Sequence, residues 1–498
     1  MSPDLVEGIR TGVAVLLLAV VAIGLIPVVS TAVQFVLVTM HAAVNHYRAA
    51  EPYLPRVVVV IPAWNEGAVV GASIDRLMRL EYPRDRLRIY VVDDASTDGT
   101  AEVVQERAAV HPGSVVHLRR EVGGQGKAHT LNHGLRAALD DDWMEAVLIM
   151  DADVIYQPDS LRKMTRHLAD PAVGAVTAYI REGSQDKNYL TRFIGFEYVL
   201  GQLAARRAQN VVRAMACLAG GAQLHSRANL EALGGRIDTG TLAEDTITTF
   251  ETQLHGRRAV FEPHAVVLAE EPQSVDALWR QRLRWARGNL QVTRKYRWLW
   301  FRLGQHRDLG RATFALQWFS ILVLPLVMVV VPLAFLGLFA LDHPLAQVAF
   351  RALWISAACL YAFAVVFTLQ LDPVTARTSW FQAVMFPGAV SVGVMITAFF
   401  PGLIEVRLPG VFGLELTSAG QVIWTVAIYL WVSISMVLAW VARVIEPTRV
   451  GRYLTPLMIY LVGYGPLQCA IAVDAFYREI RHEDAPWEKT EKTGRVLG

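Results

Sequence analysis

Long apolar stretches lie towards both ends of this 498-residue chain and enclose a more polar region. Residues 12–40 form one such stretch, which only Gly24, Pro27 and a few small polar residues interrupt. Five more apolar blocks follow residue 313, at about 314–341, 346–371, 380–403, 422–442 and 452–474. Each block is close to or above the roughly 18–20 residues that cross the apolar core of a bilayer. The pattern predicts an integral membrane protein.

The first stretch is much longer than the apolar region of a typical signal peptide, and no convincing small-residue cleavage site follows it. We therefore expect a retained anchor. The number of spans near the carboxyl end stays open, because the block at 380–403 contains Pro387 and Pro401. This block or the last one is either a simple span or an interfacial or re-entrant segment.

Residues 56–275 alternate short apolar runs with amphipathic segments. Strands are expected in RVVVVIPAWNE (56–66), LRIYVVDD (87–94), SVVHLRR (114–120) and MEAVLIMDAD (144–153), and a helix is expected at 126–139. Ser96, Thr97 and Asp98 mark the start of another helix after the second strand. Strands that alternate with helices predict an α/β fold, with a mostly parallel sheet covered by helices.

Acidic residues follow two of these strands. Asp93 and Asp94 end one strand, and Asp151 and Asp153 end another. In open α/β sheets, ligands bind beyond the carboxyl ends of the strands. Buried carboxylates are costly unless they are paired, and a divalent cation that also binds a diphosphate would satisfy them. Helix caps and surface ion pairs are the alternative for such acids, and for Asp98 we accept a cap.

The charge distribution indicates the orientation in the membrane, and the cysteine positions argue against two kinds of site. The formal net charge is +2, but residues 277–313 hold ten Lys or Arg residues and a single acid, Asp308. With Arg48 and Arg56 after the first span, this basic run predicts that the polar region is cytoplasmic. The three cysteines lie far apart, which argues against both a disulfide framework and a structural zinc site.

Six short motifs occur in a fixed order along the chain: IPAWNE (61–66), VVDDAST (91–97), GGQGKAHTLNHG (123–134), DAD (151–153), AED (243–245) and QRLRW (281–285). This ordered set resembles the family 2 glycosyltransferases with a Rossmann-like GT-A fold. It is most similar to the membrane-embedded processive synthases of cellulose, chitin, hyaluronan and poly-N-acetylglucosamine. The resemblance covers roughly residues 56–300 and the membrane layout.

The resemblance implies a role for each matching residue. Donor-binding residues would be Pro62, Glu66, Asp93, Asp94, Lys127, Asp151, Gln281 and Arg284. Asp153 and Asp151 would hold Mg²⁺ or Mn²⁺, and Asp245 would be the general base beside Glu244. Acceptor-binding residues would be Trp285, Gly220 and Gly221. The chain departs from the family's T-E-D motif at Ala243, which replaces threonine. A general base suits the chemistry, because a sugar hydroxyl is a poor nucleophile until a carboxylate takes its proton.

The QRLRW segment predicts an amphipathic helix. Trp279, Leu283, Ala286 and Leu290 form one apolar stripe, expected to lie against the bilayer. Trp285 lies on the opposite face, where the resemblance implies stacking on the acceptor sugar. An aromatic residue at the membrane interface is the alternative for Trp285. A plain glycine turn is the alternative for CLAGGAQLHSR (217–227).

The expected function is a processive inverting glycosyltransferase that polymerises a β-linked exopolysaccharide from a UDP-sugar and extrudes it through its own channel. The segments LWRQRLRWARG and WEKTEKTG look most similar to poly-β-1,6-N-acetylglucosamine synthases, which implies UDP-N-acetylglucosamine. The alternative is a single transfer onto a polyprenyl phosphate or other lipid. A third possibility, a scaffold that has lost catalysis, is disfavoured because Asp94, Asp151, Asp153 and Asp245 are all present.

The expected organisation is a cytosolic α/β GT-A domain inserted between transmembrane helices of the cell (inner) membrane. The segments are a transmembrane helix (1–45), the GT-A domain (46–275), amphipathic interface helices (276–312), a carboxyl-terminal transmembrane region (313–475) and a polar tail (476–498). Expected partners are the UDP-sugar, the growing polysaccharide and the bilayer. We expect no nucleic acid, and accessory subunits are not identified.

Overall fold

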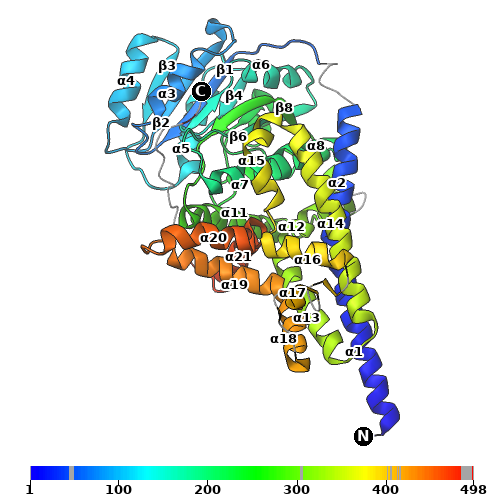
Figure 1. The fold of residues 1–498 in the computed structure, drawn as a ribbon. Coiled ribbons are helices and arrows are strands. Elements are labelled where there is room, and N and C mark those ends of the chain that lie inside the picture. The colour runs from blue at the N-terminus through cyan, green and yellow to red at the C-terminus, as the bar shows by residue number, and fades with distance from the viewer. Residues whose placement is uncertain are drawn as a thin grey trace. The chain divides into compact units, whose positions relative to one another are not determined.

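The computed structural model describes residues 2–43, 50–302, 307–400, 402–403, 407–411, 413, 417–483 and 496 (Figure 1). Arg48, Pro401 and most of the predicted tail lie outside these residues. The chain forms two compact units. The sheet unit comprises Val36–Gln273, Arg287–Ala315 and Asp484–Gly498, and the helical unit comprises Met1–Phe35, Ser274–Ala286 and Leu316–Glu483.

The sheet unit contains an eight-stranded sheet in the order β3-β2-β1-β4-β7-β6-β8-β5. Its strands are β1 (Val57–Ala63), β2 (Leu87–Asp93), β3 (Val115–Arg119), β4 (Ala146–Ile149), β5 (Val154–Tyr156), β6 (Val173–Glu182), β7 (Gln223–Ser226) and β8 (Arg258–Ala269). The first four strands in this order are parallel, as predicted. The other half is mixed, because β7 runs antiparallel to both β4 and β6, and β5 runs antiparallel to β8.

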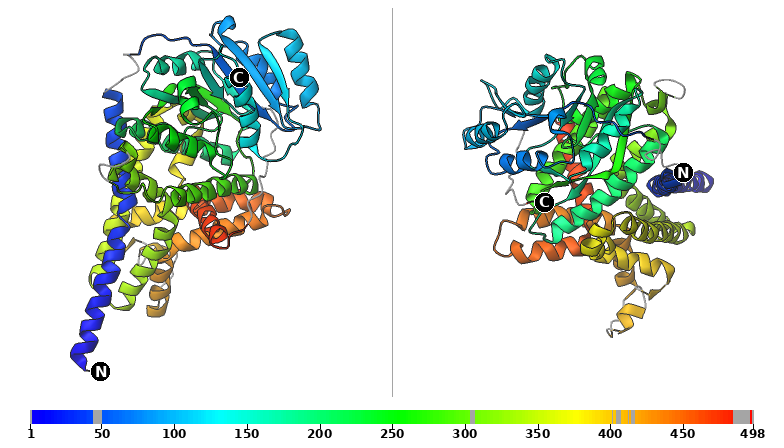
Figure 2. Two further views of the ribbon diagram at one scale, coloured as in Figure 1. Left: turned by 180° about the vertical axis from the view of Figure 1, so that it is seen from behind. Right: turned by 90° about the horizontal axis from the view of Figure 1, so that it is seen from above.

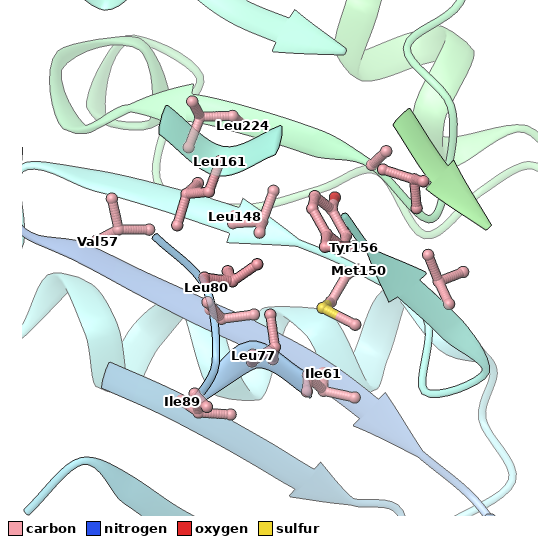
Figure 3. Close-up of a cluster of buried hydrophobic side chains, with 14 of the residues drawn as sticks. Val57, Ile61, Leu77, Leu80, Ile89, Leu148, Met150, Tyr156, Leu161 and Leu224 are labelled. Atoms are coloured by element: carbon pink, nitrogen blue, oxygen red, sulfur yellow. The ribbon is translucent and has the colours of Figure 1, made fainter. Parts of the chain in front are cut away.

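The strand β1 explains how the sheet is covered. Residues 57–61 are all buried, as expected of a parallel strand with helices on both faces. Val57, Val59 and Ile61 pack with Leu77 of α3 (Val70–Leu77) in the cluster of Figure 3. Val58 and Val60 point to the other face, where α5 (Lys127–Leu139) packs. The same cluster as Ile61 takes in α4 (Thr100–Val110) and α6 (Ser160–Thr165).

Strand register places the acids that the sequence singled out along one edge. Ala63 at the end of β1 pairs with Asp93 at the end of β2. Val60 of β1 pairs with Ile149, two residues before Asp151. The carboxyl ends of β1, β2 and β4 therefore meet at one edge of the sheet, where the sequence predicted these acids to lie.

The sheet unit also contains further helical elements. They are α7 (Tyr189–Tyr198), a π-helical turn (Val199–Ala204), α8 (Ala205–Val212), α9 (Arg227–Ala232) and α10 (Glu244–Leu254). Short 3₁₀ turns occur at Arg84–Arg86, Arg166–Ala169 and Arg307–Gly310. The helix α11 (Val275–Lys295) contributes residues to both units.

Among the described residues, two helices are long and apolar enough to cross a membrane. One is the 41-residue stretch Pro3–Ala43, formed by α1 (Pro3–Ile23) and α2 (Ile26–Ala43), which follow one another nearly in line (Figure 2). The other is α14 (Leu345–Leu371). The number rises to six if each of four bent helix pairs counts as one span.

The four bent pairs correspond to the other predicted apolar blocks. They are α12–α13 (Ala312–Leu322 and Leu324–Ala340, 70°), α15–α16 (Pro373–Val384 and Ala389–Phe399, 71°), α18–α19 (Ser418–Tyr429 and Trp431–Ile445, 69°) and α20–α21 (Gly451–Val462 and Tyr464–Ile480, 97°). A short helix, α17 (Leu408–Val411), lies between the second and third pairs. The blocks at 380–403 and 452–474, which were left open as spans or re-entrant segments, are bent pairs. The blocks at 314–341 and 422–442 are bent as well.

Candidate active site

The two acids at the end of β2 are held by neighbouring arginines. Asp93 is fully buried, and its Oδ2 accepts from Arg119 Nη1 at 2.6 Å. The Asp94 carboxylate pairs with Arg120, and its Oδ2 accepts from the Gly124 backbone N–H at 2.9 Å. These contacts fix the loop that leads into α5. Neither arginine was predicted as a site residue from the sequence, although Arg119 lies opposite Asp93 in the parallel register of β2 and β3.

The turns after β1 and β2 are joined by side-chain hydrogen bonds. The Glu66 backbone N–H donates to Thr100 Oγ1 at 2.8 Å, and Gly67 N–H donates to Asp98 Oδ2 at 3.0 Å. The other Asp98 oxygen accepts from Thr100 N–H at 3.0 Å, but the N-cap of α4 is Gly99, so Asp98 contacts the start of this helix from one residue before the predicted cap position. Pro62 and Glu66 are half-buried along this edge.

Lys127 and Asp151 form the centre of the site. Lys127 is the first residue of α5, and its Nζ lies 2.5 Å from Asp151 Oδ1 and 4.0 Å from Glu244 Oε1. The same Nζ donates to Gly220 O at 3.3 Å. Burial alone would lower the pKa of Lys127, but the Asp151, Glu244 and Asp245 carboxylates outweigh it and raise that pKa. Lys127 is therefore a buried ammonium that three acids surround.

Asp245 lies in the first turn of α10, where the helix dipole favours carboxylates. Its Oδ1 accepts from Thr246 N–H at 2.7 Å. A Cβ added at Gly220 would lie 3.3 Å from the other oxygen, Oδ2, and 3.4 Å from Lys127 Nζ. A Cβ at Gly221 would lie 3.3 Å from Asp151 Oδ2. The glycine pair thus lies close to Asp151 and Asp245, and a side chain on either glycine would crowd these carboxylates and, at Gly221, also Val154.

Asp153 lies half-buried in the turn between β4 and β5. Among the described residues, no group of three or more His, Cys, Asp or Glu side chains is placed to hold a metal ion. Two carboxylates with hard oxygen donors still fit Mg²⁺ or Mn²⁺, since such ions often take one or two carboxylates and complete their shell with substrate phosphates. The residues present therefore fit a cation that arrives with a diphosphate.

Two further residues interact with Asp245 and were not assigned a chemical role from the sequence. Arg206 is 8% exposed and follows the π-helical turn, and burial lowers its pKa while Cys217 and Asp245 oppose that shift. Burial raises the pKa of the Cys217 thiol, and Asp245 raises it further. No local pattern in the sequence marks Arg206 as a partner of Asp245, because the two residues lie far apart along the chain.

Gln281, Arg284 and Trp285 belong to the helical unit. Trp285 is 39% exposed, and the Arg282 guanidinium lies over its ring with Cζ 3.9 Å from the centroid. Arg282 also donates to Gln281 Oε1 at 2.9 Å. Arg282 therefore contacts two residues of the motif, Gln281 and Trp285.

The apolar stripe of α11 was expected to lie against the bilayer, and for Trp279 this was wrong. Trp279 is 1% exposed, and its Nε1 donates to Asp474 Oδ2 of α21 at 2.8 Å. The Arg443 guanidinium lies over the Trp279 ring, with Cζ 4.7 Å from the centroid. Protein helices cover this part of the stripe, and the buried indole N–H finds an acid there.

Ala243, where the family has threonine, lies close to Gly288 within the sheet unit. A Cβ on Gly288 would lie 2.8 Å from Ala243 Cβ. Ala243 is 6% exposed and precedes α10 without a side-chain cap. The start of α10 thus packs directly on the backbone of α11.

Comparison with known proteins identifies the family. Residues 55–288 match the family described as "Glycosyltransferase like family 2". The probable glycosyltransferase YdaM of Bacillus subtilis is 30% identical over 341 residues, which cover 67% of this chain and 79% of that protein. Beta-monoglucosyldiacylglycerol synthase of Synechocystis sp. is 32% identical over 50% of each chain. Poly-beta-1,6-N-acetyl-D-glucosamine synthase of Staphylococcus epidermidis is 29% identical over 48% of this chain and 56% of its own length.

The chain thus spans about half the length of the last two relatives. Among solved structures, the mannosyltransferase PcManGT of Pyrobaculum calidifontis, in complex with GDP-Man and Mn²⁺, is 25% identical with a TM-score of 0.49. That match covers 76% of this chain and 99% of the other. On the family match and the similarity to YdaM, the chain belongs to the family 2 glycosyltransferases and is a hexosyltransferase with a GT-A sheet.

Proposed function

We propose that the protein is a processive inverting glycosyltransferase that polymerises a β-linked polysaccharide from a UDP-sugar, with UDP-N-acetylglucosamine as the first candidate. The observation that carries the proposal is the glycine pair Gly220–Gly221, which lies close to Lys127, Asp151 and Asp245 and has no side chain that would keep an acceptor away from them. A donor diphosphate needs positive charge, and an acceptor hydroxyl needs a base and room to approach. The relative named poly-beta-1,6-N-acetyl-D-glucosamine synthase supports the choice of sugar.

In the proposed reaction, the acceptor hydroxyl enters beside Gly220 and attacks the anomeric carbon of the donor. A new carbon–oxygen bond forms as the bond from that carbon to the diphosphate breaks, and the configuration inverts. Asp245 Oδ2 takes the hydroxyl proton, while Thr246 N–H holds Oδ1 in place. The Lys127 ammonium faces the negative charge that develops on the leaving diphosphate.

Asp151 and Asp153 are the residues that would hold Mg²⁺ or Mn²⁺. Such a cation, when bound, supplies charge stabilisation to the leaving diphosphate. We assign the nucleoside to the edge lined by Pro62, Glu66 and Asp94, with Asp93 supporting it from the buried side through Arg119. Gln281 and Arg284 are proposed to contact the diphosphate, and Trp285 the acceptor sugar.

We further propose that the protein is a multi-pass membrane protein with its sheet unit in the cytoplasm and that the polymer leaves through the membrane helices. The two long apolar helices and the four bent apolar pairs support this assignment. A second candidate is a single transfer onto a lipid acceptor. It is favoured by the 32% identity to a protein named beta-monoglucosyldiacylglycerol synthase.

The test is to incubate the purified protein in detergent with a panel of UDP-sugars and Mg²⁺ or Mn²⁺, and to measure UDP release and product size. We expect the fastest release with UDP-N-acetylglucosamine and a product of many sugars, and no product from Asp245→Asn. A product of one sugar on a lipid would favour the second candidate. Absence of UDP release with every donor would contradict both.

A further inference from the structure

The loop between α8 and β7, which carries Gly220 and Gly221, is bound by side chains from three elements, α8, α10 and β6. Four of its backbone N–H groups donate to such side chains: Met215 to Gln253 Oε1 (2.8 Å), Ala216 to Gln209 Oε1 (3.0 Å), Leu218 to Thr249 Oγ1 (2.9 Å) and Ala219 to Thr177 Oγ1 (3.0 Å). Thr177 Oγ1 also donates to Ala222 O at 2.8 Å. The loop is therefore held along most of its length.

Among these side chains, Thr249 bonds both to the loop and to the turn that carries Asp245. It is 0% exposed and lies on α10, one helical turn after Asp245. Its Oγ1 donates to Asp245 O at 2.6 Å and accepts from Leu218 N–H at 2.9 Å. A hydroxyl can donate one hydrogen bond and accept others at the same time. One oxygen atom thus joins the helical turn that carries Asp245 to the loop that carries Gly220.

We propose that Thr249 is a positioning residue of glycosyl transfer, which fixes the spacing of Asp245 and Gly220, where the acceptor hydroxyl is proposed to enter. This inference rests on the proposed function of these two residues. Positioning is worth much in such a reaction, since a misplacement of about 1 Å can cost about 100-fold in rate. A water molecule is small and needs no extended binding surface. Hydrolysis of the donor therefore depends less on this loop than transfer to a sugar does.

The chain offers a matched control for Thr249. Thr248 is the neighbouring residue on α10 and is 4% exposed. Its Oγ1 donates to Glu244 O at 2.7 Å, so it makes the same kind of bond to its own helix as Thr249. Thr249→Val removes the bond to Leu218, Thr249→Ser keeps a hydroxyl, and Thr248→Val removes only a bond within the helix.

The first measurement compares transfer with hydrolysis. In Thr249→Val we expect kcat for transfer to the acceptor to fall by about 10- to 100-fold. The KM for the UDP-sugar should stay within about twofold of the wild-type value, as expected when ground-state binding is kept. The share of UDP released without sugar transfer should rise. Thr249→Ser should restore most transfer, and Thr248→Val should behave as the wild type. Normal transfer in Thr249→Val, or an equal loss in Thr248→Val, would overturn the proposal.

The second measurement separates this inference from the proposed function. Amide hydrogen exchange of residues 215–219 is followed in the full-length protein without donor. We expect faster exchange at Leu218 in Thr249→Val and unchanged exchange in Thr248→Val. Two results would refute the positioning role of Thr249 even if the enzyme turns over. One is unchanged exchange in Thr249→Val, and the other is a wild-type Leu218 amide that exchanges as fast as an unprotected loop. A wild type that releases no UDP refutes the proposed function, whatever the exchange shows.

Discussion

Lys127 Nζ and Asp151 Oδ1 lie 2.5 Å apart, and they come from different elements, the start of α5 and the turn after β4. Nearby carboxylates keep the pKa of this buried ammonium above its usual value, so it stays charged across the neutral pH range. The donor site therefore contains a fixed positive charge of its own. Gly220 lies close to both Lys127 Nζ and Asp245 Oδ2, so this positive charge and the proposed base contact the same glycine.

Gly220→Ala should block transfer without unfolding the protein. The new Cβ would lie 3.3 Å from Asp245 Oδ2 and 3.4 Å from Lys127 Nζ, in the space assigned to the acceptor. We expect kcat to fall by about 100-fold, the scale of a small displacement of the reacting groups. The matched control is Gly201→Ala, because a Cβ there would meet no atom within 4 Å. Equal activity of the two variants would contradict the assignment of Gly220.

Asp245→Asn should separate catalysis from binding. The amide keeps the shape of the side chain but cannot take a proton from the acceptor hydroxyl. We expect kcat to fall by about 100-fold or more while the donor Kd changes by only a few fold. Calorimetric titration with UDP and steady-state kinetics on the same preparation measure both. A parallel collapse of donor binding would make Asp245 a binding residue.

Removal of divalent cations should abolish activity, and Mg²⁺ or Mn²⁺ should restore it. Asp153→Asn should prevent this recovery, because the amide loses the negative charge that a hard cation prefers. Binding of Mn²⁺ is measured directly from the loss of its free electron paramagnetic resonance signal in the presence of UDP. Full activity in excess chelator, or unchanged Mn²⁺ binding in Asp153→Asn, would exclude the assigned role.

Trp285→Ala should stop polymer formation and leave UDP-sugar binding intact. The Arg282 guanidinium lies over the indole ring, but the side chain is still 39% exposed, so a sugar ring can contact the remaining indole surface. Trp298→Ala is the control, since Trp298 is exposed to a similar extent, 42%. Product length and donor affinity are measured on the same purified variants. Polymer of normal length from Trp285→Ala would remove this residue from the acceptor site.

The sheet unit should lose stability below about pH 6.5 through His225. This side chain is 0% exposed, and burial lowers its pKa to about 4. The unfolded chain takes up the proton first, so the contribution is complete above pH 6.5 and is lost as the pH falls towards 4. The full loss is about 3 kcal/mol. The thermal midpoint should therefore fall less between pH 7 and pH 5 in His225→Gln, and an identical fall would contradict this origin.

The strands of the parallel half could be read from the sequence, because a strand covered on both faces appears as a continuous apolar run such as Val57–Ile61. Their carboxyl ends then placed Asp93 and Asp151 at one edge. In the other half, β5 and β7 could not be predicted, since they are only three and four residues long and run antiparallel to their neighbours.

Contacts between residues that lie far apart along the chain could not be predicted from the sequence, for a different reason. Periodicity shows that one face of α11 is apolar, but not whether lipid or protein covers it, and Trp279 proved to be covered by protein. The bond from Leu218 to Thr249 joins residues 31 positions apart and leaves no local pattern. The resemblance to a family supplied Lys127 and Asp245, but not the groups that hold them.

The close approach of Ala243 and Gly288 has an evolutionary consequence. A larger residue at either position removes the space that the other one uses, so the effect of a change at one site depends on the residue at the other. We therefore expect substitutions at positions 243 and 288 to be non-additive in their effect on stability. The order in which substitutions accumulate is constrained, and the start of α10 and the helix α11 are expected to evolve together.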